Sequence, residues 1–204
     1  QALDPTKAFN HYVINSWSIR EGLPQISVQA ITQDQHGYIW VGTQSGVARF
    51  DGVRFTTYKP ETTPELPGVW VRSLLADKEG RVWIGTYKGL AVWQDGVFRS
   101  VPAADAAHYP VLDIFAIVET SDGITVATGS GVFDVRGRSL VRRAGSPSAA
   151  QALLPRADGL WVGSLGGVYL MGANGQQRFL PLPPEAASAA VTKLAEAQDR
   201  IWAG

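Results

Sequence analysis

Short apolar runs alternate with turns rich in Asp and Gly along the whole chain. The first run of each unit is expected at 28–33, 71–76, 114–119, 150–154 and 191–195, and a tight turn and a second apolar run follow. Runs this short, bounded by glycine, are typical of β-strands. No stretch shows a sustained helical period, and we expect at most a short helical turn in the alanine-rich segment 181–198.

The second run of each unit carries a tryptophan with a glycine two positions later. Trp40-Val-Gly, Trp83-Ile-Gly, Trp161-Val-Gly and Trp202-Ala-Gly are the clear copies. We interpret 122–128 as a degenerate copy in which Val126 replaces the tryptophan and Thr128 the glycine. The units recur about every 40 residues, the length of one four-stranded propeller blade.

A second hairpin in each unit is marked by Asp51-Gly52 and Asp95-Gly96, with Gly137 and Gly175 at the matching later places. Asp-Gly suits the positive φ angles of a two-residue hairpin turn. The fold class we predict is all-β, a β-propeller of four-stranded antiparallel blades, here a partial ring of about four to five blades. The alternative is chance recurrence of Gly and Trp in a β-sandwich. The expected modules are 27–58, 70–102, 113–144, 148–183 and an incomplete 190–204, with 9–17 as a candidate ring-closing strand.

The four tryptophans, Trp40, Trp83, Trp161 and Trp202, are expected in the core, where a large flat ring fills the wedge between neighbouring blades. The glycine two positions later lies on the same face of its strand. We expect its missing side chain to let a ring of the adjacent blade approach.

Composition narrows the function classes. Of 204 residues, 45% are hydrophobic, enough for a sizeable core, and the 18 basic and 18 acidic residues cancel. A neutral chain does not attract phosphate backbones over distance, so we expect no nucleic acid partner. The chain has no cysteine, which excludes disulfides, thiolate metal sites and cysteine nucleophiles. No apolar run is long enough to span a bilayer.

Three strings carry a family resemblance: Trp17-Ser-Ile-Arg-Glu-Gly-Leu-Pro-Gln, Trp40-Val-Gly-Thr and Phe50-Asp-Gly-Val-Arg-Phe. They are similar to the two-component regulator propeller repeat, densely over 17–58 and 70–101, weakly over 113–143 and fairly over 148–180. The resemblance implies a bacterial sensor with its propeller on the periplasmic side of the inner membrane. Such proteins usually continue into a β-sandwich, a transmembrane helix and a histidine kinase or diguanylate cyclase.

The ends of the chain agree with a piece of such a protein. It begins with Gln1, which fits removal of a signal peptide or of other preceding sequence, and stops at Gly204 within a Trp-x-Gly strand. We therefore expect the N-terminal portion of a propeller, periplasmic, that meets the membrane only through parts outside this chain. An open stack leaves bare edges, so a homodimer is also expected.

The sequence nominates no catalytic residue, metal site or cofactor. Asp34, Asp77 and Asp158 recur at the first hairpin, and we interpret them as bonding their own turn backbone rather than calcium. His36 stands in a turn where sister units have other polar residues, and His11 has no acidic neighbour in sequence. One arginine cluster is interpreted as a solvated outer edge: Arg136, Arg138, Arg142 and Arg143.

A ligand is expected on the face formed by the loops between blades and between second and third strands. Exposed aromatic rings beside charged groups suit stacking on sugars and hydrogen bonding at the rim. The ligand is then a small molecule or glycan, and the candidate residues are Arg20, Glu21, Gln25, Trp70, Arg72, Tyr87, Lys88, His108 and Tyr109.

Three functions remain open. The favoured one is a ligand-sensing propeller of a membrane-bound signalling protein. The second is a protein-interaction or dimerisation scaffold without a small ligand. The third is a propeller glycosidase or lyase, which needs paired carboxylates in a central pocket. We expect this segment not to be an enzyme.

Overall fold

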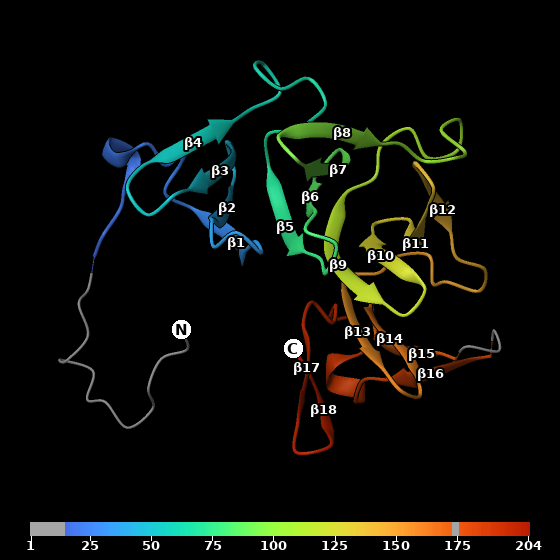
Figure 1. Cartoon of the computed structure of the whole chain (residues 1–204). Helices are drawn as coiled ribbons and strands as arrows, with labels where there is room; N and C mark the ends of the chain where they lie inside the picture. The colour runs from blue at the N-terminus through green and yellow to red at the C-terminus, as the bar shows by residue number, and fades with distance from the viewer. Residues whose placement is uncertain (1–14, 173–175) are drawn as a thin grey trace.

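The computed structural model describes residues 15–172 and 176–204. They form four four-stranded antiparallel sheets and a two-stranded one, each with its strands in sequence order (Figure 1). We call these sheets blades one to five. Blade one contains β1 (Val28–Gln33), β2 (Ile39–Thr43), β3 (Gly46–Phe50) and β4 (Phe55–Tyr58). Blade two contains β5 (Val71–Ala76), β6 (Val82–Thr86), β7 (Gly89–Gln94) and β8 (Val97–Val101).

The later blades repeat this order. Blade three contains β9 (Ile114–Thr120), β10 (Gly123–Thr128), β11 (Gly131–Arg136) and β12 (Ser139–Arg142). Blade four contains β13 (Ala152–Arg156), β14 (Gly159–Ser164), β15 (Gly167–Met171) and β16 (Gln177–Pro181), and blade five contains β17 (Leu194–Ala197) and β18 (Arg200–Ala203). The all-β propeller fold is thus confirmed.

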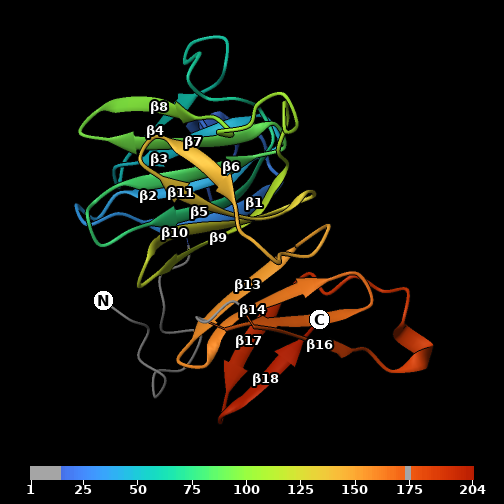
Figure 2. The same cartoon turned by 90° about the vertical axis from the view of Figure 1, so that its right-hand side faces the viewer.

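The blades stack through their first strands. β1, β5, β9, β13 and β17 contact one another in succession, and Figures 1 and 2 show the sheets turning around a common centre on the side of these strands. This is the arrangement of a propeller, in which the first strand of each blade lies nearest the axis. Loops that precede the first strands therefore converge there.

Of the two Asp-Gly hairpins, only the second forms the predicted two-residue turn; at the first, residues 51–54 form a longer loop between β3 and β4. Asp95 and Gly96 have φ angles of 50° and 84°, the two positive values that a type I′ turn needs between right-twisted strands. At the first hairpin only Gly52 has a positive φ, and the Asp51 carboxylate accepts hydrogen bonds from the backbone N–H groups of Val53 and Arg54. Gly175 lies outside the described residues.

Two of the four tryptophans fill inter-blade wedges completely. Trp40 packs with Val82 and Trp93 of blade two, and Trp83 packs with Ile117 and Ile124 of blade three. Trp161 is only half-buried. For Trp202 the prediction of a core position is wrong: the residue is 61% exposed, because no third strand among the described residues pairs with β17–β18 to cover it.

The glycines of the first two Trp-x-Gly strings, Gly42 and Gly85, do allow a close approach of the next blade, but the approaching group is an aliphatic side chain and not the ring we expected. A Cβ at Gly42 would lie 2.6 Å from a methyl of Val71, and one at Gly85 would lie 2.7 Å from a methyl of Ile114. Each partner stands at the start of the next blade's first strand. The missing side chain therefore sets the distance between blades.

In blade three the predicted alignment with the other blades is wrong by one residue. The Thr128 hydroxyl donates to the Gly131 carbonyl at 2.9 Å, as Thr43 does to Gly46. Counting back from this shared bond, Thr125, not Val126, occupies the tryptophan position, and it pairs with Asp134 across the hairpin. Val126 and Thr128 were both wrongly assigned.

In this register Ala127 stands at the position of the glycine in the Trp-x-Gly strings, and the residue that faces it from the next blade is also different. Ala127 packs in one cluster with Ala150, whose backbone N–H binds the Thr128 carbonyl at the place of Val71 and Ile114 in the other blades. A larger residue on one side of the junction is thus matched by a smaller one on the other, as close packing requires.

Two further expectations concern the ends of the chain. The ring-closing strand at 9–17 lies mostly outside the described residues, and Asn15–Trp17 is not a strand. Trp17 packs edge-on against Phe50, with ring centroids 5.1 Å apart. The helical turn expected in 181–198 is present as a 3-10 turn at Pro184–Ala186 (η3). Within the described ranges no helix has the length and hydropathy to cross a membrane.

Candidate functional site

The structure brings four of the nine candidate residues together, on blade two. Trp70 and Arg72 flank the start of β5, and Tyr87 and Lys88 form the β6–β7 turn. The Tyr87 backbone N–H donates to the Trp70 carbonyl at 3.0 Å. This hydrogen bond ties the inter-blade loop to the hairpin turn, as the prediction that both loops share one face requires.

Arg72 is held between two aromatic rings. Its guanidinium carbon lies 4.2 Å from the centroid of the Trp70 ring and 5.1 Å from that of the Phe115 ring. Phe115 belongs to β9, so the cation bridges blades two and three. Arg72 and Phe115 are both bulge residues, skipped in the pairing of their strands with β6 and β10. A bulge re-aims a side chain away from the regular pleat, which directs these two toward the inter-blade junction.

Asp113, which immediately precedes β9, completes the cluster. Its Oδ1 lies 2.7 Å from Nε of Arg72. Neither atom makes a hydrogen bond of regular geometry. The contact is therefore an ion pair that is short enough for a hydrogen bond but has an unfavourable angle. Burial raises the pKa of the Asp113 carboxyl above its ordinary value, and the Arg72 charge offsets this only in part. The pair is thus poorly solvated and incompletely bonded.

Trp70 also has an unused donor. Its indole Nε1 is buried and makes no hydrogen bond to any described residue. Indole N–H groups usually find a partner when they are buried. Trp70 Nε1, Arg72 and Asp113 therefore present two donors and one acceptor with unfilled bonding capacity beside aromatic rings, which suits recognition of a polar molecule with a flat or apolar face.

Two residues of this cluster were missed from the sequence, Asp113 and Phe115. They occupy in blade three the positions that Trp70 and Arg72 occupy in blade two, each immediately before or after the first residue of the inner strand. The shared bulge that relates these positions is visible only in the structure. Tyr87 is packed close to the loop before Trp70, since a Cβ at Gly68 would lie 2.8 Å from its ring. Lys88 Nζ lies 5.2 Å from the Tyr87 ring centroid.

Three other candidates lie in the chain before β1 and are engaged locally. Arg20 and Glu21 belong to the 3-10 turn η2 (Ile19–Glu21), where Glu21 and Ser18 cap each other reciprocally. Gly22 ends this turn, and its carbonyl accepts a hydrogen bond from Thr57 of β4. The turn therefore sits beside the outer strand of blade one, as Figure 1 shows, away from the Trp70 cluster.

Gln25, the third of these candidates, hydrogen-bonds to Ser27 within its own loop. The last two candidates lie between β8 and β9. Tyr109 packs edge-on against Phe133, with ring centroids 5.0 Å apart, and it shares the lining of a cavity of about 220 Å³ with Lys88. His108 is exposed, and its Nδ1 lies 3.3 Å from Asp105.

Two of the three aspartates of the first hairpin, Asp77 and Asp34, bond their own turn backbone as predicted, whereas Asp158 accepts only the indole N–H of Trp161 among the described residues. One Asp77 carboxylate oxygen accepts the backbone N–H groups of Glu79 and Arg81, and the other accepts the indole N–H of Trp83 at 2.7 Å. Asp34 bonds its turn and Trp40 in the same way. Burial alone would raise the pKa of Asp77, but the bonds from Trp83 and Arg81 outweigh it and lower that pKa.

The prediction for His36 is confirmed, and the prediction for the arginine cluster is only partly correct. His36 is exposed in the turn, as expected. The arginine cluster is not a solvated edge as a whole. Arg142 donates to the carbonyls of Ser130, Ser146 and Pro147, and Arg143 pairs with the buried carboxylate of Asp134. Only Arg136 and Arg138 are largely exposed.

Comparison with known proteins agrees with this architecture. Residues 22–45 and 65–88 match the two-component regulator propeller family. A histidine kinase of Formosa agariphila is 42% identical over 50 residues, which make up 24% of this chain and 4% of that protein. The chain therefore spans only a small part of this curated relative.

Solved structures of similar fold include extracellular domains of hybrid two-component systems from B. thetaiotaomicron. One aligns with a TM-score of 0.71 and 21% identity over 89% of this chain and 26% of the other. A second aligns with a TM-score of 0.74 and 16% identity over 87% and 26%. The chain spans about a quarter of each.

A virginiamycin B lyase from Staphylococcus aureus shares the fold as well, with a TM-score of 0.66 and 14% identity over 87% of this chain and 62% of the lyase. At this identity the likeness concerns the fold alone. The family match rests on sequence, and its two segments contain the first two strands of blades one and two with the loops that precede them. This chain therefore carries two-component regulator propeller repeats, folded as successive blades of a β-propeller.

Proposed function

We propose that the chain is the ligand-sensing part of a membrane-bound bacterial signalling protein and stands on the periplasmic side of the inner membrane. The output, a histidine kinase or a diguanylate cyclase, lies in other parts of that protein. The repeat match and the fold shared with extracellular domains of two-component systems support this proposal. Recognition rather than catalysis is the role we assign to the segment.

The observation that carries the proposal is the cluster of Trp70, Arg72, Asp113 and Phe115. It joins two blades, keeps an indole donor unpaired and holds a carboxylate in a site where burial raises its pKa. A ligand can stabilise such a cluster more than water does, because it can form the missing hydrogen bonds while its apolar face covers the aromatic rings. We propose that the ligand is a small polar molecule or a glycan.

Binding there has a direct route to a signal. The cluster connects the start of β5 to the start of β9, so a ligand that fills it changes the free energy of the junction between blades two and three. A ligand shifts a conformational equilibrium only by its differential affinity for the two states. The proposal therefore requires that the bound form favour one arrangement of the blades, or of two subunits, over another.

Calorimetric titration of the purified protein with glycans and small polar metabolites tests the proposal. We expect one class to bind, and Trp70→Phe and Arg72→Leu each to weaken it by about tenfold or more, the effect of losing a hydrogen bond to a charged or buried partner. Arg178→Gln, an exposed arginine on β16, is the matched control and should bind as the wild type does.

Sedimentation over a concentration series separates the alternative. If no ligand class binds while the chain self-associates or captures a protein partner through the same face, the sensor proposal is wrong and the chain is an interaction scaffold. Ligand binding that ignores both substitutions would likewise show that the cluster is not the site.

A further inference from the structure

Blade three departs from its neighbours at three facing positions on adjacent strands. Thr125 of β10 stands opposite Asp134 of β11, and Arg143 follows β12 with its backbone N–H on the Val132 carbonyl. In the other blades the corresponding positions hold a tryptophan and mostly apolar partners. These sets are Trp40, Arg49 and Tyr58 in blade one, Trp83, Val92 and Val101 in blade two, and Trp161, Leu170 and Leu180 in blade four.

The three polar side chains form one connected network. The Thr125 hydroxyl donates to Oδ1 of Asp134 at 2.8 Å, and Nε of Arg143 donates to both oxygens of the same carboxylate. Nη2 of Arg143 also donates to Asp134 and to the Thr125 hydroxyl. Thr125 and Asp134 are buried. The Arg143 guanidinium thus bonds the residue that stands at the tryptophan position of the other blades.

Stability alone gives no reason for this exchange. A buried ion pair loses hydration that its attraction does not fully return, and apolar residues of similar volume are often neutral or more stabilising in its place. The other blades show that this fold accepts an apolar set at the same positions. A polar set at one junction only is therefore a candidate for recognition.

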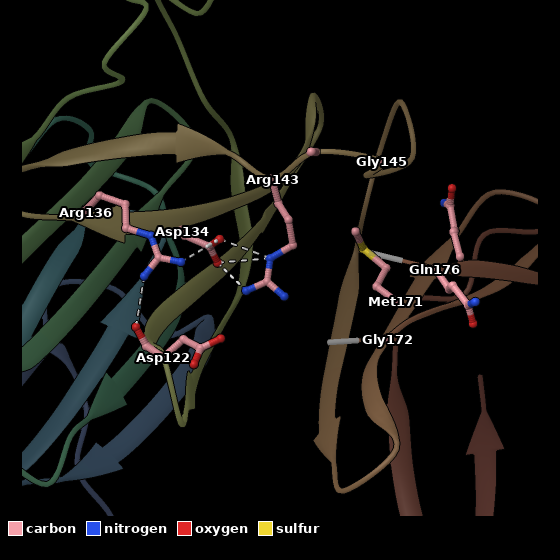
Figure 3. A pocket seen from close by; sticks show the side chains of 10 residues that line it. Asp122, Asp134, Arg136, Arg143, Gly145, Met171, Gly172 and Gln176 are labelled. Atoms are coloured by element: carbon pink, nitrogen blue, oxygen red, sulfur yellow. Dashed lines mark hydrogen bonds and ion pairs between the residues drawn. The ribbon is translucent and has the colours of Figure 1, made fainter. Parts of the chain in front are cut away.

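The network borders a cavity. A pocket of about 260 Å³ lies between blades three and four. As Figure 3 shows, Asp134, Arg143, Arg136 and Asp122 lie on one side and Met171 and Gly172 on the other. The volume is just below the usual 300–1,000 Å³ of ligand pockets, so the cavity suits a compact molecule and not a long chain of sugars.

The lining has surplus donors next to a separate acceptor. Arg136 and Arg143 share the single carboxylate of Asp134, and its oxygens are occupied by their guanidinium groups and Thr125. Nη1 of Arg143 and Nε of Arg136 have no hydrogen-bond partner in the described part of the chain. Among residues 15–172 and 176–204, the Asp122 carboxylate accepts a hydrogen bond only from the exposed Ser121 hydroxyl, at 3.4 Å, while the Asp122 backbone carbonyl accepts one from Arg136.

We propose that this pocket binds a small zwitterion of the amino acid type. The carboxylate of the ligand bonds the free guanidinium N–H groups of Arg136 and Arg143, its ammonium group pairs with the Asp122 carboxylate, and Met171 covers its side chain. Guanidinium groups bind carboxylates through parallel charged hydrogen bonds. An anion without an ammonium group would be repelled by Asp122 and gain less.

Calorimetry with a panel of free L-amino acids tests the proposal, with acetate, phosphate and glycerol as comparison probes. We expect at least one amino acid to bind saturably at millimolar concentration or below, and the comparison probes not to compete. Asp122→Asn, which changes an exposed side chain, should weaken binding about tenfold or more. Arg99→Gln, an exposed arginine on β8, should not change it.

A second variant guards against misfolding. Thr125→Trp combined with Asp134→Leu and Arg143→Leu copies the set of blade four, so the blade should remain folded by circular dichroism while the pocket is filled and binding is lost. The proposal is overturned if no amino acid binds, if acetate or phosphate binds equally well, or if binding survives the filled pocket. Trp70→Phe, at a different junction, should leave this binding intact, which separates it from the proposed sensor site.

Discussion

Placing a methyl group at Gly42 perturbs the contact that sets the distance between blades. A Cβ at this position would lie 2.6 Å from Cγ1 and 3.1 Å from Cβ of Val71. Carbon atoms in favourable contact are about 3.5–4.0 Å apart, so blade two or the Val71 side chain must move by roughly 1 Å. The φ angle of Gly42 is not positive, so an alanine meets no backbone strain and the effect is one of packing.

The magnitude follows from opposing contributions. Overpacking of a core costs about 1–3 kcal/mol, and replacing a strand glycine by alanine returns about 0.4–1 kcal/mol by reducing the entropy of the unfolded chain. We expect Gly42→Ala to lower the free energy of unfolding by about 1–2 kcal/mol. Val71→Ala alone removes two fully buried methyl groups and should cost about 2 kcal/mol, including the space it leaves.

The double variant is the informative one, because blade three already uses this pair. Ala127 and Ala150 pack together at the equivalent junction. In Gly42→Ala with Val71→Ala, the new methyl group enters the space that the valine leaves. We therefore expect the double variant to lose about 1–2 kcal/mol less than the sum of the single losses, a coupling in the range seen for residues in contact.

Urea unfolding followed by far-ultraviolet circular dichroism measures all four members of the cycle. Val97→Ala, at an exposed position of β8, serves as the control partner and should add to Gly42→Ala without coupling. Strict additivity of the Gly42 and Val71 changes would refute the reasoning, since it would mean that the two side chains do not meet across the junction.

Three further predictions concern charged groups and their partners. Trp83→Phe keeps a ring in the wedge but removes the indole donor from Asp77, and should cost about 1.5–3 kcal/mol in urea unfolding. Because the folded state lowers the pKa of Asp77, the ionised carboxylate stabilises the fold at pH values above 3.8, the ordinary pKa of the group. This stabilisation is lost as the pH falls through the lowered pKa of the folded state. The wild type should therefore lose stability in acid more steeply than Asp77→Asn, and equal slopes would contradict the assignment. The raised pKa of Asp113 has the opposite sign: relative to Asp113→Asn, the wild type should gain stability as pH falls toward 3.8, measured as the difference between their urea midpoints.

Only part of the candidate site could be predicted from the sequence. Trp70 and Arg72 could be selected because an aromatic and a cation flank the start of a predicted inner strand. Asp113 and Phe115 could not be joined to them, because their positions lie one blade further along and meet only through the stacking of β5 and β9. Arg20 and Glu21 were selected as charged residues of a loop on the expected ligand face, yet local capping holds them beside β4.

By itself the sequence determined the strands, their order and the type of fold. Asp-Gly turns and the Trp-x-Gly repeat act over a few residues, and the local backbone conformation there depends on little else. The register of the third blade was decided only by tertiary structure, because Thr125 and Val126 suit a strand equally well and the hydrogen bond from Thr128 to Gly131 selects between them. The contacts of the candidate site were likewise decided only by tertiary structure, since they join side chains of different blades whose meeting depends on how the sheets stack.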